Sequence, residues 1–184
     1  MKKIILASGS PRRREIFSQV GLEFQVKPSK VEEIITKKKP EEVVMELSME
    51  KARDIAQNEK NAIVVGADTI VSFQGNILGK PENEEEAAAM LSMLSGQTHQ
   101  VYTGVTLVQQ DKQESFFEKT DVTFYDLEPE EIKKYIDTKD CMDKAGAYGI
   151  QGCAAGFIQG ICGDYYNVVG FPIAHFLQIL KKFR

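Results

Sequence analysis

The sequence predicts an α/β fold built on a mixed β-sheet. Apolar residues recur at helical spacing in several segments, such as residues 41–57, and these segments alternate with short apolar runs typical of buried strands, such as residues 3–7. A turn signal at residues 74–76 adds a hairpin to this alternation. Because alternation places helices against a sheet and hairpins add antiparallel pairs, we expect a mixed sheet with flanking helices.

The first helix is predicted to follow the first strand directly. The apolar run at residues 3–7 is broken by Ser8-Gly9, and a helix then runs from Pro11 to about residue 20. Ser10 is a natural N-cap and Pro11 a natural first helical residue, while Gly21 suits the end of the helix. The residues expected to face inward from this helix are Ile16, Phe17 and Val20.

The remaining elements follow from the same patterns. Residues 62–65 and 70–73 are apolar runs separated by Gly66-Ala67-Asp68-Thr69, so we expect a strand that is interrupted and then resumes. The acidic turn Glu84-Glu85-Glu86 suits the positive end of a helix macrodipole and predicts a helix over 83–94. The other expected elements are a strand over 22–26, a polar loop over 28–40, strands over 98–109 and 114–125, helices over 128–136 and 172–180, and a glycine-rich irregular segment over 141–170.

Length and composition limit the class of protein. The chain has 184 residues and a formal net charge of -4, which fits a single domain over residues 1–184 and argues against a nucleic-acid coat. No apolar stretch approaches the roughly 18 residues needed to span a membrane. The three cysteines, an odd number without a C-x-x-C spacing, fit reduced thiols and a cytoplasmic location.

The segment from Ser8 to Arg13 is the first candidate site. A helix start binds anions through its free N–H groups, yet Arg12, Arg13 and Arg14 stand in this first turn, where cations are unfavourable. Such a departure from the local rule is typical of a functional site, and the arginine fork matches phosphate oxygens. We therefore favour a phosphate site here over a capped helix with solvated arginines, with Arg14 as the solvated one.

Acidic and basic candidates follow along the chain. Asp68 comes directly after a buried apolar run, where α/β sheets place ligands; it is a candidate base or Mg²⁺ ligand, or else a residue that ends a strand. The pair Glu32-Glu33 in the polar loop offers carboxylate oxygens that suit a hard cation, or else is simply solvated. Lys51 lies on the apolar side of its helix, where it either snorkels or meets a buried anion. Lys80 is a candidate phosphate contact or a surface lysine.

The glycine-rich run over residues 144–152 is the last candidate. Small residues surround Tyr148 and Gln151, which indicates a backbone that passes close to something flat, or else a plain glycine-rich turn. A glutamine amide offers both a donor and an acceptor and can read the edge of a base. His99 and His175 are interpreted as structural residues.

Taken together, these segments resemble the Maf family of nucleoside triphosphate pyrophosphatases. A single one of these motifs is weak, but the ordered set spans nearly the whole chain and is specific. The motifs that carry the resemblance are Leu6-Ala7-Ser8-Gly9-Ser10-Pro11-Arg12-Arg13, Gly66-Ala67-Asp68-Thr69-Ile70-Val71, Gly79-Lys80-Pro81, Leu94-Ser95-Gly96-Gln97-Thr98-His99, Thr103-Gly104-Val105, Lys144 to Gly152, and Tyr166-Asn167-Val168-Val169-Gly170-Phe171-Pro172.

The resemblance implies an activity and a fold. It implies hydrolysis of a nucleoside triphosphate to the monophosphate and pyrophosphate, with a divalent cation such as Mg²⁺ or Mn²⁺. It also implies a Maf/ITPase-like arrangement, in which an elongated mixed sheet with flanking helices forms two lobes around a central cleft. The run Gly149-Ile150-Gln151-Gly152 is similar to the branch of the family that acts on dTTP and UTP.

The same resemblance assigns roles to residues. Asp68 matches the proposed proton acceptor, and Glu33 and Asp68 are the metal-binding candidates. The residues assigned to the phosphates are Ser8, Arg13, Lys51 and Lys80, and those assigned to base selection are Arg12, Thr69 and Gln151.

Two other functions stay open at this point. The chain is alternatively a non-catalytic nucleotide-binding regulator of septum formation, or a pyrophosphatase for a modified nucleotide. Catalysis is favoured because the carboxylates of Asp68 and Glu33 accompany the basic residues. A homodimer is an open alternative to a monomer.

Overall fold

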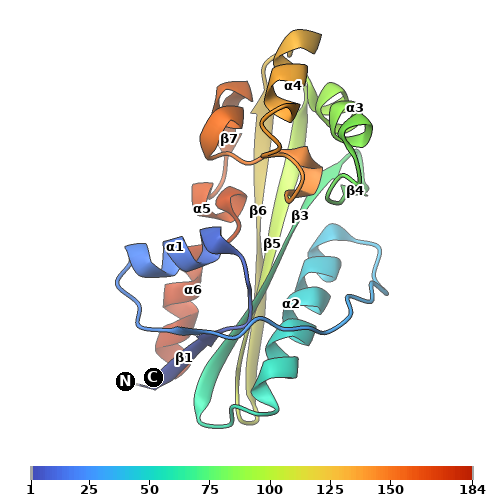
Figure 1. Cartoon of the computed structure of the whole chain (residues 1–184). Helices are drawn as coiled ribbons and strands as arrows, with labels where there is room; N and C mark the ends of the chain where they lie inside the picture. Colours follow the sequence, from blue (N-terminus) through green and yellow to red (C-terminus); the bar gives the residue numbers. More distant parts are fainter. Residues whose placement is uncertain (1, 184) are drawn as a thin grey trace. The chain divides into compact units, whose positions relative to one another are not determined.

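The computed structural model describes residues 2–183, in which helices and strands alternate along the chain (Figure 1). The strands are β1 (Lys3–Leu6), β2 (Gln25–Val26), β3 (Ala62–Phe73), β4 (Asn76–Leu78), β5 (Thr98–Gln109), β6 (Lys112–Phe124) and β7 (Ile158–Cys162). The helices are α1 (Pro11–Gln19), α2 (Pro40–Ala56), α3 (Glu84–Leu94), α4 (Pro129–Ile136), α5 (Tyr165–Val169) and α6 (Ile173–Leu180), with short 3₁₀ turns η1 (Ala145–Ala147), η2 (Gly152–Phe157) and η3 (Lys181–Phe183).

The sheet is mixed, as the sequence predicts. Its strand order is β2-β1-β3-β5-β6-β7, with β4 paired to β3. β1 runs parallel to both β2 and β3, whereas β4 is antiparallel to β3 and β7 is antiparallel to β6. The β3–β4 turn uses Gln74 and Gly75 at positive φ, which a tight two-residue hairpin requires.

The chain forms two compact units, each assembled from separate segments. Unit 1 comprises the chain up to Thr69, residues Thr103–Glu118 and the chain from Gly170 onward; unit 2 comprises Ile70–Tyr102 and Lys119–Val169. Neither unit is continuous in sequence, because the boundaries fall inside β3, β5 and β6.

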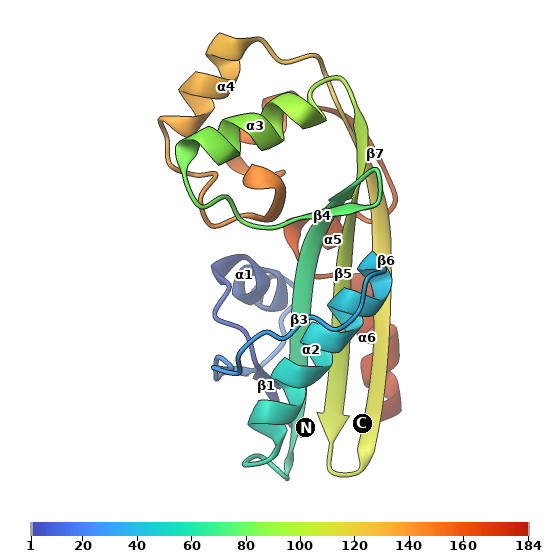
Figure 2. The ribbon, with the colours of Figure 1, turned by 90° about the vertical axis from the view of Figure 1, so that its right-hand side faces the viewer.

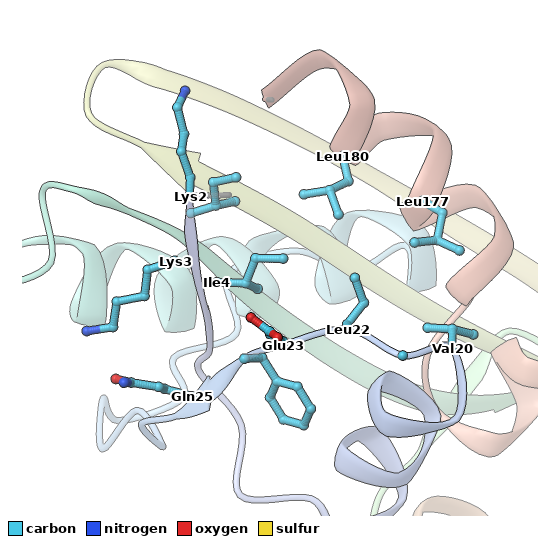
Figure 3. Close-up of a pocket in the computed structure, with 12 residues that line it drawn as sticks. Lys2, Lys3, Ile4, Val20, Leu22, Glu23, Gln25, Leu177 and Leu180 are labelled. Carbon is cyan, nitrogen blue, oxygen red and sulfur yellow. The ribbon is translucent and has the colours of Figure 1, made fainter.

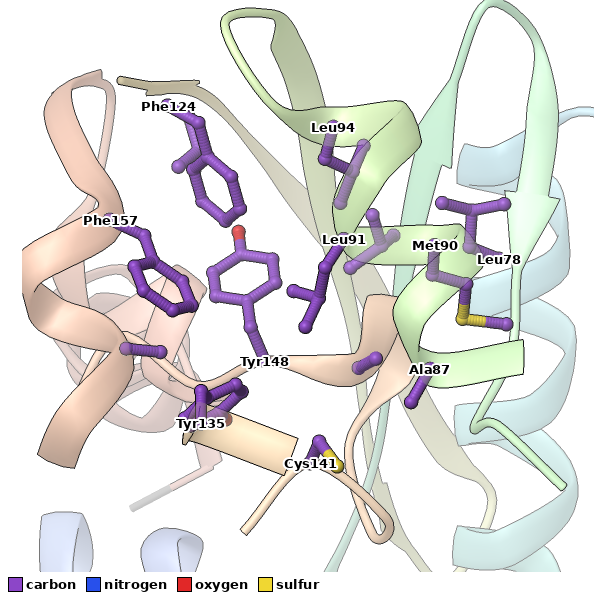
Figure 4. Close-up of a cluster of buried hydrophobic side chains, with 14 of the residues drawn as sticks. Leu78, Ala87, Met90, Leu91, Leu94, Phe124, Tyr135, Cys141, Tyr148 and Phe157 are labelled. Atoms are coloured by element: carbon purple, nitrogen blue, oxygen red, sulfur yellow. The ribbon is translucent and has the colours of Figure 1, made fainter. Parts of the chain in front are cut away.

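Each unit buries its own apolar side chains. In unit 1, Phe17 of α1 stacks edge-on against Phe171 and contacts Phe176 of α6, with ring centroids 4.8 and 5.3 Å apart. In unit 2, α3 and α4 close over a cluster whose aromatic members include Phe124, Tyr148 and Phe157 (Figure 4). Burial of such side chains supplies most of the favourable free energy of folding.

Helix α2 lies close against β3 and β5 in unit 1 (Figure 2). A Cβ atom at Gly66 of β3 would overlap the carbonyl oxygen of Ser48 and lie 2.7 Å from the amide nitrogen of Ala52. A Cβ atom at Gly104 of β5 would likewise lie 2.8 Å from the amide nitrogen of Met45. These two glycines therefore allow the helix backbone to approach the sheet.

The structure corrects the prediction for residues 62–73. β3 runs from Ala62 to Phe73 without interruption, so Asp68 lies inside a strand and does not follow its end. The expected break was wrong because Gly66 serves close packing against α2, not a turn. A glycine in an apolar run indicates either a turn that interrupts the strand or a strand position where another backbone packs closely. Only the element that packs against the glycine distinguishes these two cases.

Three smaller expectations also need correction. Val20 is 40% exposed because it follows the last residue of α1, where the chain turns at Gly21 with a φ of +70°. The strand expected over 22–26 is reduced to Gln25–Val26. Ser10 occupies the N-cap position of α1, but its side chain makes no capping hydrogen bond. The predicted helices over 41–57, 83–94, 128–136 and 172–180 are confirmed within one or two residues at each end.

Unit 1 also contains a pocket of about 910 Å³ between residues 20–25 and α6 (Figure 3). Leu22, Leu177 and Leu180 line it, and none of the residues predicted to form the site does so. Across residues 2–183, no helix combines the length and the apolar character needed to cross a membrane.

Candidate active site

The loop that follows β1 holds the first predicted site residue. The amide of Ala7 donates to the carbonyl oxygen of Val65 at 2.8 Å, which extends the parallel pairing of β1 with β3 by one residue. Ser8 is then buried, and its hydroxyl oxygen accepts hydrogen bonds from the amide of Ser10 at 3.3 Å and from Arg13 Nη1 at 2.9 Å. The Ser8 side chain is thus fixed toward the interior of the site.

Arg13 joins several segments of unit 1 through its guanidinium group. In addition to Ser8, it donates to the carbonyl oxygens of Ala67 and Gly170, each at 2.9 Å, and to Thr69 Oγ1 at 3.1 Å. These bonds use four of the five N–H groups of the guanidinium. Arg13 therefore holds the chain on both sides of Asp68 through hydrogen bonds to Ala67 and Thr69.

The acceptors of the four Arg13 hydrogen bonds are uncharged carbonyl and hydroxyl oxygens. Burial lowers the pKa of Arg13, while the negative charges of Asp68 and Glu33 oppose that shift. The neighbouring positive charge of Arg12, which is half-buried, lowers the pKa of Arg13 further. Arg14 is exposed, as the sequence predicts for the solvated member of the three.

Asp68 is paired with a lysine from α2. Side chains alternate between the faces of a strand, so Asp68 shares a face of β3 with Gly66, against which α2 packs. Lys51 of α2 reaches from there to Asp68, with Nζ 2.6 Å from Oδ1. The sequence leaves two alternatives for Lys51: an ammonium that snorkels to solvent or one that meets a buried anion. The structure shows the second, because the partner Asp68 is only 9% exposed.

Glu33 completes a carboxylate–lysine cluster, which we define as Glu33, Lys51 and Asp68. Lys51 Nζ lies 2.7 Å from Glu33 Oε1, so one ammonium bridges two carboxylates. The side chains of Lys51 and Asp68 are mostly buried, whereas that of Glu33 is 53% exposed. The cluster therefore presents Glu33 to solvent and keeps Asp68 at its inner end.

The cluster has donors suited to a divalent cation. Within residues 2–183, no group of three or more His, Cys, Asp and Glu side chains is placed to hold a metal ion. Glu33 and Asp68 nevertheless both pair with the ammonium of Lys51. Because Mg²⁺ is commonly bound by one or two carboxylates together with phosphate groups, the chemistry of these two side chains fits a cation that binds together with phosphate.

Thr69 lies in a hydrogen-bond network beside the cluster. Its hydroxyl accepts from Arg13, contacts the hydroxyl of Thr103 at 2.8 Å and lies 3.3 Å from the carbonyl oxygen of Gly170. Sequence reasoning missed Thr103 and Gly170 as parts of the site. The only signal for them is the motif context, because Gly170 acts through its main chain and Thr103 lies on a different strand.

Unit 2 carries the other two predicted residues. Lys80 and Gln151 are both exposed, and their segments are joined by a hydrogen bond from the amide of Gly146 to the carbonyl oxygen of Gly79 at 3.0 Å. Gln151 precedes the turn η2 in an extended conformation. Within unit 2, Lys80 and Gln151 thus belong to neighbouring segments.

The fold is that of a mixed α/β protein, and unit 1 brings Lys51 and Arg13 near the two carboxylates of Glu33 and Asp68. A family model described as Maf-like protein matches residues 3–183, and the chain belongs to the Maf family. The chain is 52% identical over 184 residues to a dTTP/UTP pyrophosphatase of Bacillus cereus, a match that covers 100% of this chain and 96% of the relative. It is 54% identical over 200 residues to a dTTP/UTP pyrophosphatase of Agathobacter rectalis, covering 99% of this chain and 98% of the relative.

One solved structure shows a weaker similarity. The Staphylococcus aureus Ham1 protein aligns with a TM-score of 0.47 and 18% identity, over 68% of this chain and 73% of that protein.

Proposed function

We propose that this chain is a nucleotide pyrophosphatase that hydrolyses dTTP and UTP to the monophosphate and pyrophosphate. Its relatives at 52–54% identity over the full chain are named for this activity. The observation that carries the proposal is the carboxylate–lysine cluster, in which Lys51 bridges Asp68 at 2.6 Å and Glu33 at 2.7 Å. A site that only bound phosphate would have no need of two carboxylates, since they repel the ligand.

The reaction needs a water molecule directed at the α-phosphorus. The water oxygen forms a bond to that phosphorus while the bond to the oxygen bridging the α- and β-phosphates breaks, and pyrophosphate leaves. Asp68 accepts the proton of the water or, as the alternative role, holds the metal. Positioning and charge stabilisation provide most of the catalysis in reactions of this kind.

The remaining residues bind the polyphosphate. We assign Ser8, Arg13, Lys51 and Lys80 to the phosphate oxygens, with Arg13 contributing the N–H that its internal hydrogen bonds leave available. A bound Mg²⁺ or Mn²⁺, held by Glu33 and Asp68 together with phosphate oxygens, would neutralise part of the phosphate charge. Arg13 also holds the backbone at Ala67, which fixes the position of Asp68.

Selection of thymine or uracil is assigned to Arg12, Thr69 and Gln151. A site that hydrogen-bonds the edge of a pyrimidine leaves its own polar groups unpaired when another base enters. That penalty is about 1–3 kcal/mol for each unsatisfied group, which gives roughly 10- to 100-fold discrimination.

The proposed cellular setting is the cytoplasm. The three cysteines, Cys141, Cys153 and Cys162, are all free, as expected for reduced thiols. Association of two copies into a homodimer stays a prediction from the sequence.

Pyrophosphate release from dTTP, UTP, CTP, dATP and GTP, with Mg²⁺ or Mn²⁺, tests the proposal. We expect release from dTTP and UTP, and a loss of at least about 100-fold in Asp68→Asn, since a positioned base contributes roughly 10²- to 10⁴-fold. Asp111→Asn, in the exposed turn between β5 and β6, is the matched control and should retain activity.

The alternatives give different results in the same assay. Nucleotide binding without release from any of the five would contradict the proposal and favour the regulator. Near-normal turnover by Asp68→Asn would remove both roles assigned to that carboxylate.

A further inference from the structure

A histidine and a tyrosine form a polar pair inside the apolar core of unit 2. His99 of β5 has no exposed surface, and its Nε2 lies 2.6 Å from the hydroxyl oxygen of Tyr148, which is 5% exposed. Phe124 stacks edge-on against both rings, with centroids 4.9 Å from His99 and 4.8 Å from Tyr148. Figure 4 shows the Tyr148 hydroxyl directed into this cluster, toward the ring of Phe124.

The pair is costly if its only role is to fill the core. Burial lowers the pKa of His99 to about 4, so the ring is neutral near pH 7. Its Nδ1 is buried and has no hydrogen-bond partner among residues 2–183. Apolar side chains of the same shape would fill this space without an unpaired polar atom. The single hydrogen bond between His99 and Tyr148 therefore indicates that the position of the Tyr148 side chain matters, and not only the stability of the core.

Tyr148 is the buried anchor of the segment that carries Gln151. On one side of it, Gly146 packs against Val71 and donates to the carbonyl oxygen of Gly79. On the other side, Ile150 packs on the same apolar cluster and Ala154 is completely buried. Gln151 is exposed between these buried residues, so its backbone position is set by the depth at which Tyr148 and its neighbours are held.

Lys144 adds a second restraint to the same segment. Its ammonium pairs with Asp140 at 2.9 Å and with Asp143 at 2.7 Å, and its aliphatic stem covers Gly149, where a Cβ atom would lie 2.8 Å from Lys144 Cε. The segment is thus restrained at several points, of which the His99–Tyr148 bond is the one that reaches into the core.

We infer that the hydrogen bond between His99 and Tyr148 positions Gln151 for recognition of the pyrimidine base. His99 and Tyr148 are positioning residues: neither touches the substrate, and both act through the backbone of residues 148–151. This inference rests on the proposed function. It explains how the core of unit 2 contributes to the selection of thymine or uracil by Gln151.

The test compares kcat and KM for UTP and CTP in the full-length enzyme. Tyr148→Phe removes one hydroxyl and retains the ring. We expect it to lower the UTP-to-CTP ratio of kcat/KM by about 10-fold, mainly through a higher KM for UTP. Displacement of Gln151 would cost the site one hydrogen bond to the base, and loss of one such bond has about this effect. Gln151→Ala sets the reference for complete loss of the glutamine contact.

Two control variants and two further variants of His99 separate positioning from general destabilisation. Tyr125→Phe makes the same chemical change at a side chain that is 54% exposed, and Ile136→Val shortens another buried side chain of the same core. Both should keep the wild-type ratio. His99→Gln can still bond Tyr148 and should retain most of the selectivity, whereas His99→Leu should lose it. If Tyr148→Phe does not fold, the comparison of the UTP-to-CTP ratio between His99→Gln and His99→Leu tests the inference in its place.

Amide hydrogen exchange of residues 144–152 provides a second readout, which we expect to be faster in Tyr148→Phe than in Ile136→Val. A selective wild-type enzyme with an unchanged ratio in folded Tyr148→Phe and His99→Leu would overturn the inference and leave the proposed function intact. A wild-type chain that hydrolyses none of the nucleotides would overturn the proposed function, and the inference with it.

Discussion

Arg13 shows how a residue that is unfavourable in its own helix organises a site. α1 has no acidic residue in its first turn, where negative charge would be favourable, and has arginines there instead. This conflict marks Arg13 in the sequence as functional. Its acceptors could not be predicted, because Ala67 and Gly170 contribute main-chain carbonyls that carry no side-chain signal.

Replacement of Arg13 by lysine should therefore destabilise the protein. An ammonium has no planar fork and cannot reproduce four hydrogen bonds to Ser8, Ala67, Thr69 and Gly170. At about 0.5–1.5 kcal/mol for each of the four bonds, we expect the free energy of unfolding to fall by about 2–6 kcal/mol. Urea denaturation measures it, with the exposed Arg14→Lys as the control; equal midpoints for the two variants would contradict this role.

Lys51 and Asp68 illustrate how far sequence reasoning reaches at the level of a pair. Lys51 is recognisable as a cation on the apolar side of α2, and Asp68 as a carboxylate in an apolar run. Their contact depends on the crossing of α2 over β3, which neither local pattern specifies.

At the scale of elements, most helices and the long β5–β6 hairpin could be predicted because their periodicity is local. β3 could not, since Gly66 and Asp68 interrupt its apolar pattern although the strand continues. The physical reason lies outside the segment, in the backbone of α2.

Gly66→Ala should therefore be among the most damaging single substitutions in unit 1. The added methyl group would overlap the backbone of Ser48 and Ala52, and neither can move without displacing α2 and, with it, Lys51. Overpacking of this kind costs about 1–3 kcal/mol and here involves main chain, so we expect a loss at or above the upper figure.

Thermal unfolding measures that loss, with Gly160→Ala in β7 as the matched strand glycine, because a Cβ atom there meets nothing within 4 Å. A Gly66→Ala protein as stable as Gly160→Ala would show that α2 does not pack tightly on β3.

At the scale of the whole molecule, two cores arise from interleaved segments. The boundaries between the units fall within β3, β5 and β6, so one strand contributes residues to two cores. An apolar pattern in a strand predicts that the strand is buried. It does not predict which of the two cores each half of the strand joins. The sequence predicts one domain over 1–184, and its resemblance to the Maf family implies two lobes. The boundaries between the two units are a property of the tertiary structure that neither expectation locates.

The buried histidine of unit 2 should make the molecule sensitive to acid. His99 takes up a proton near pH 6.5 when unfolded, but its native pKa is about 4. Between these values the unfolded chain binds more protons, so the free energy of unfolding falls as the pH falls from 6.5 to 4 and levels off below that range. The contribution amounts to about 3 kcal/mol.

Chemical denaturation at several pH values in this range, on the wild type and on His99→Gln, measures the contribution. The difference in unfolding free energy between the two proteins should shrink as the pH is lowered, because only the wild type carries this protonation. Parallel curves would mean that His99 is not held neutral in the core.

The central claim is that water attacks the α-phosphorus of dTTP. Hydrolysis in H₂¹⁸O, followed by mass spectrometry of both products, tests it most directly. We expect one ¹⁸O atom to enter dTMP and none to enter pyrophosphate, and Asp68→Asn to yield neither product at a comparable rate. Label in pyrophosphate, or release of inorganic phosphate in place of pyrophosphate, would contradict it.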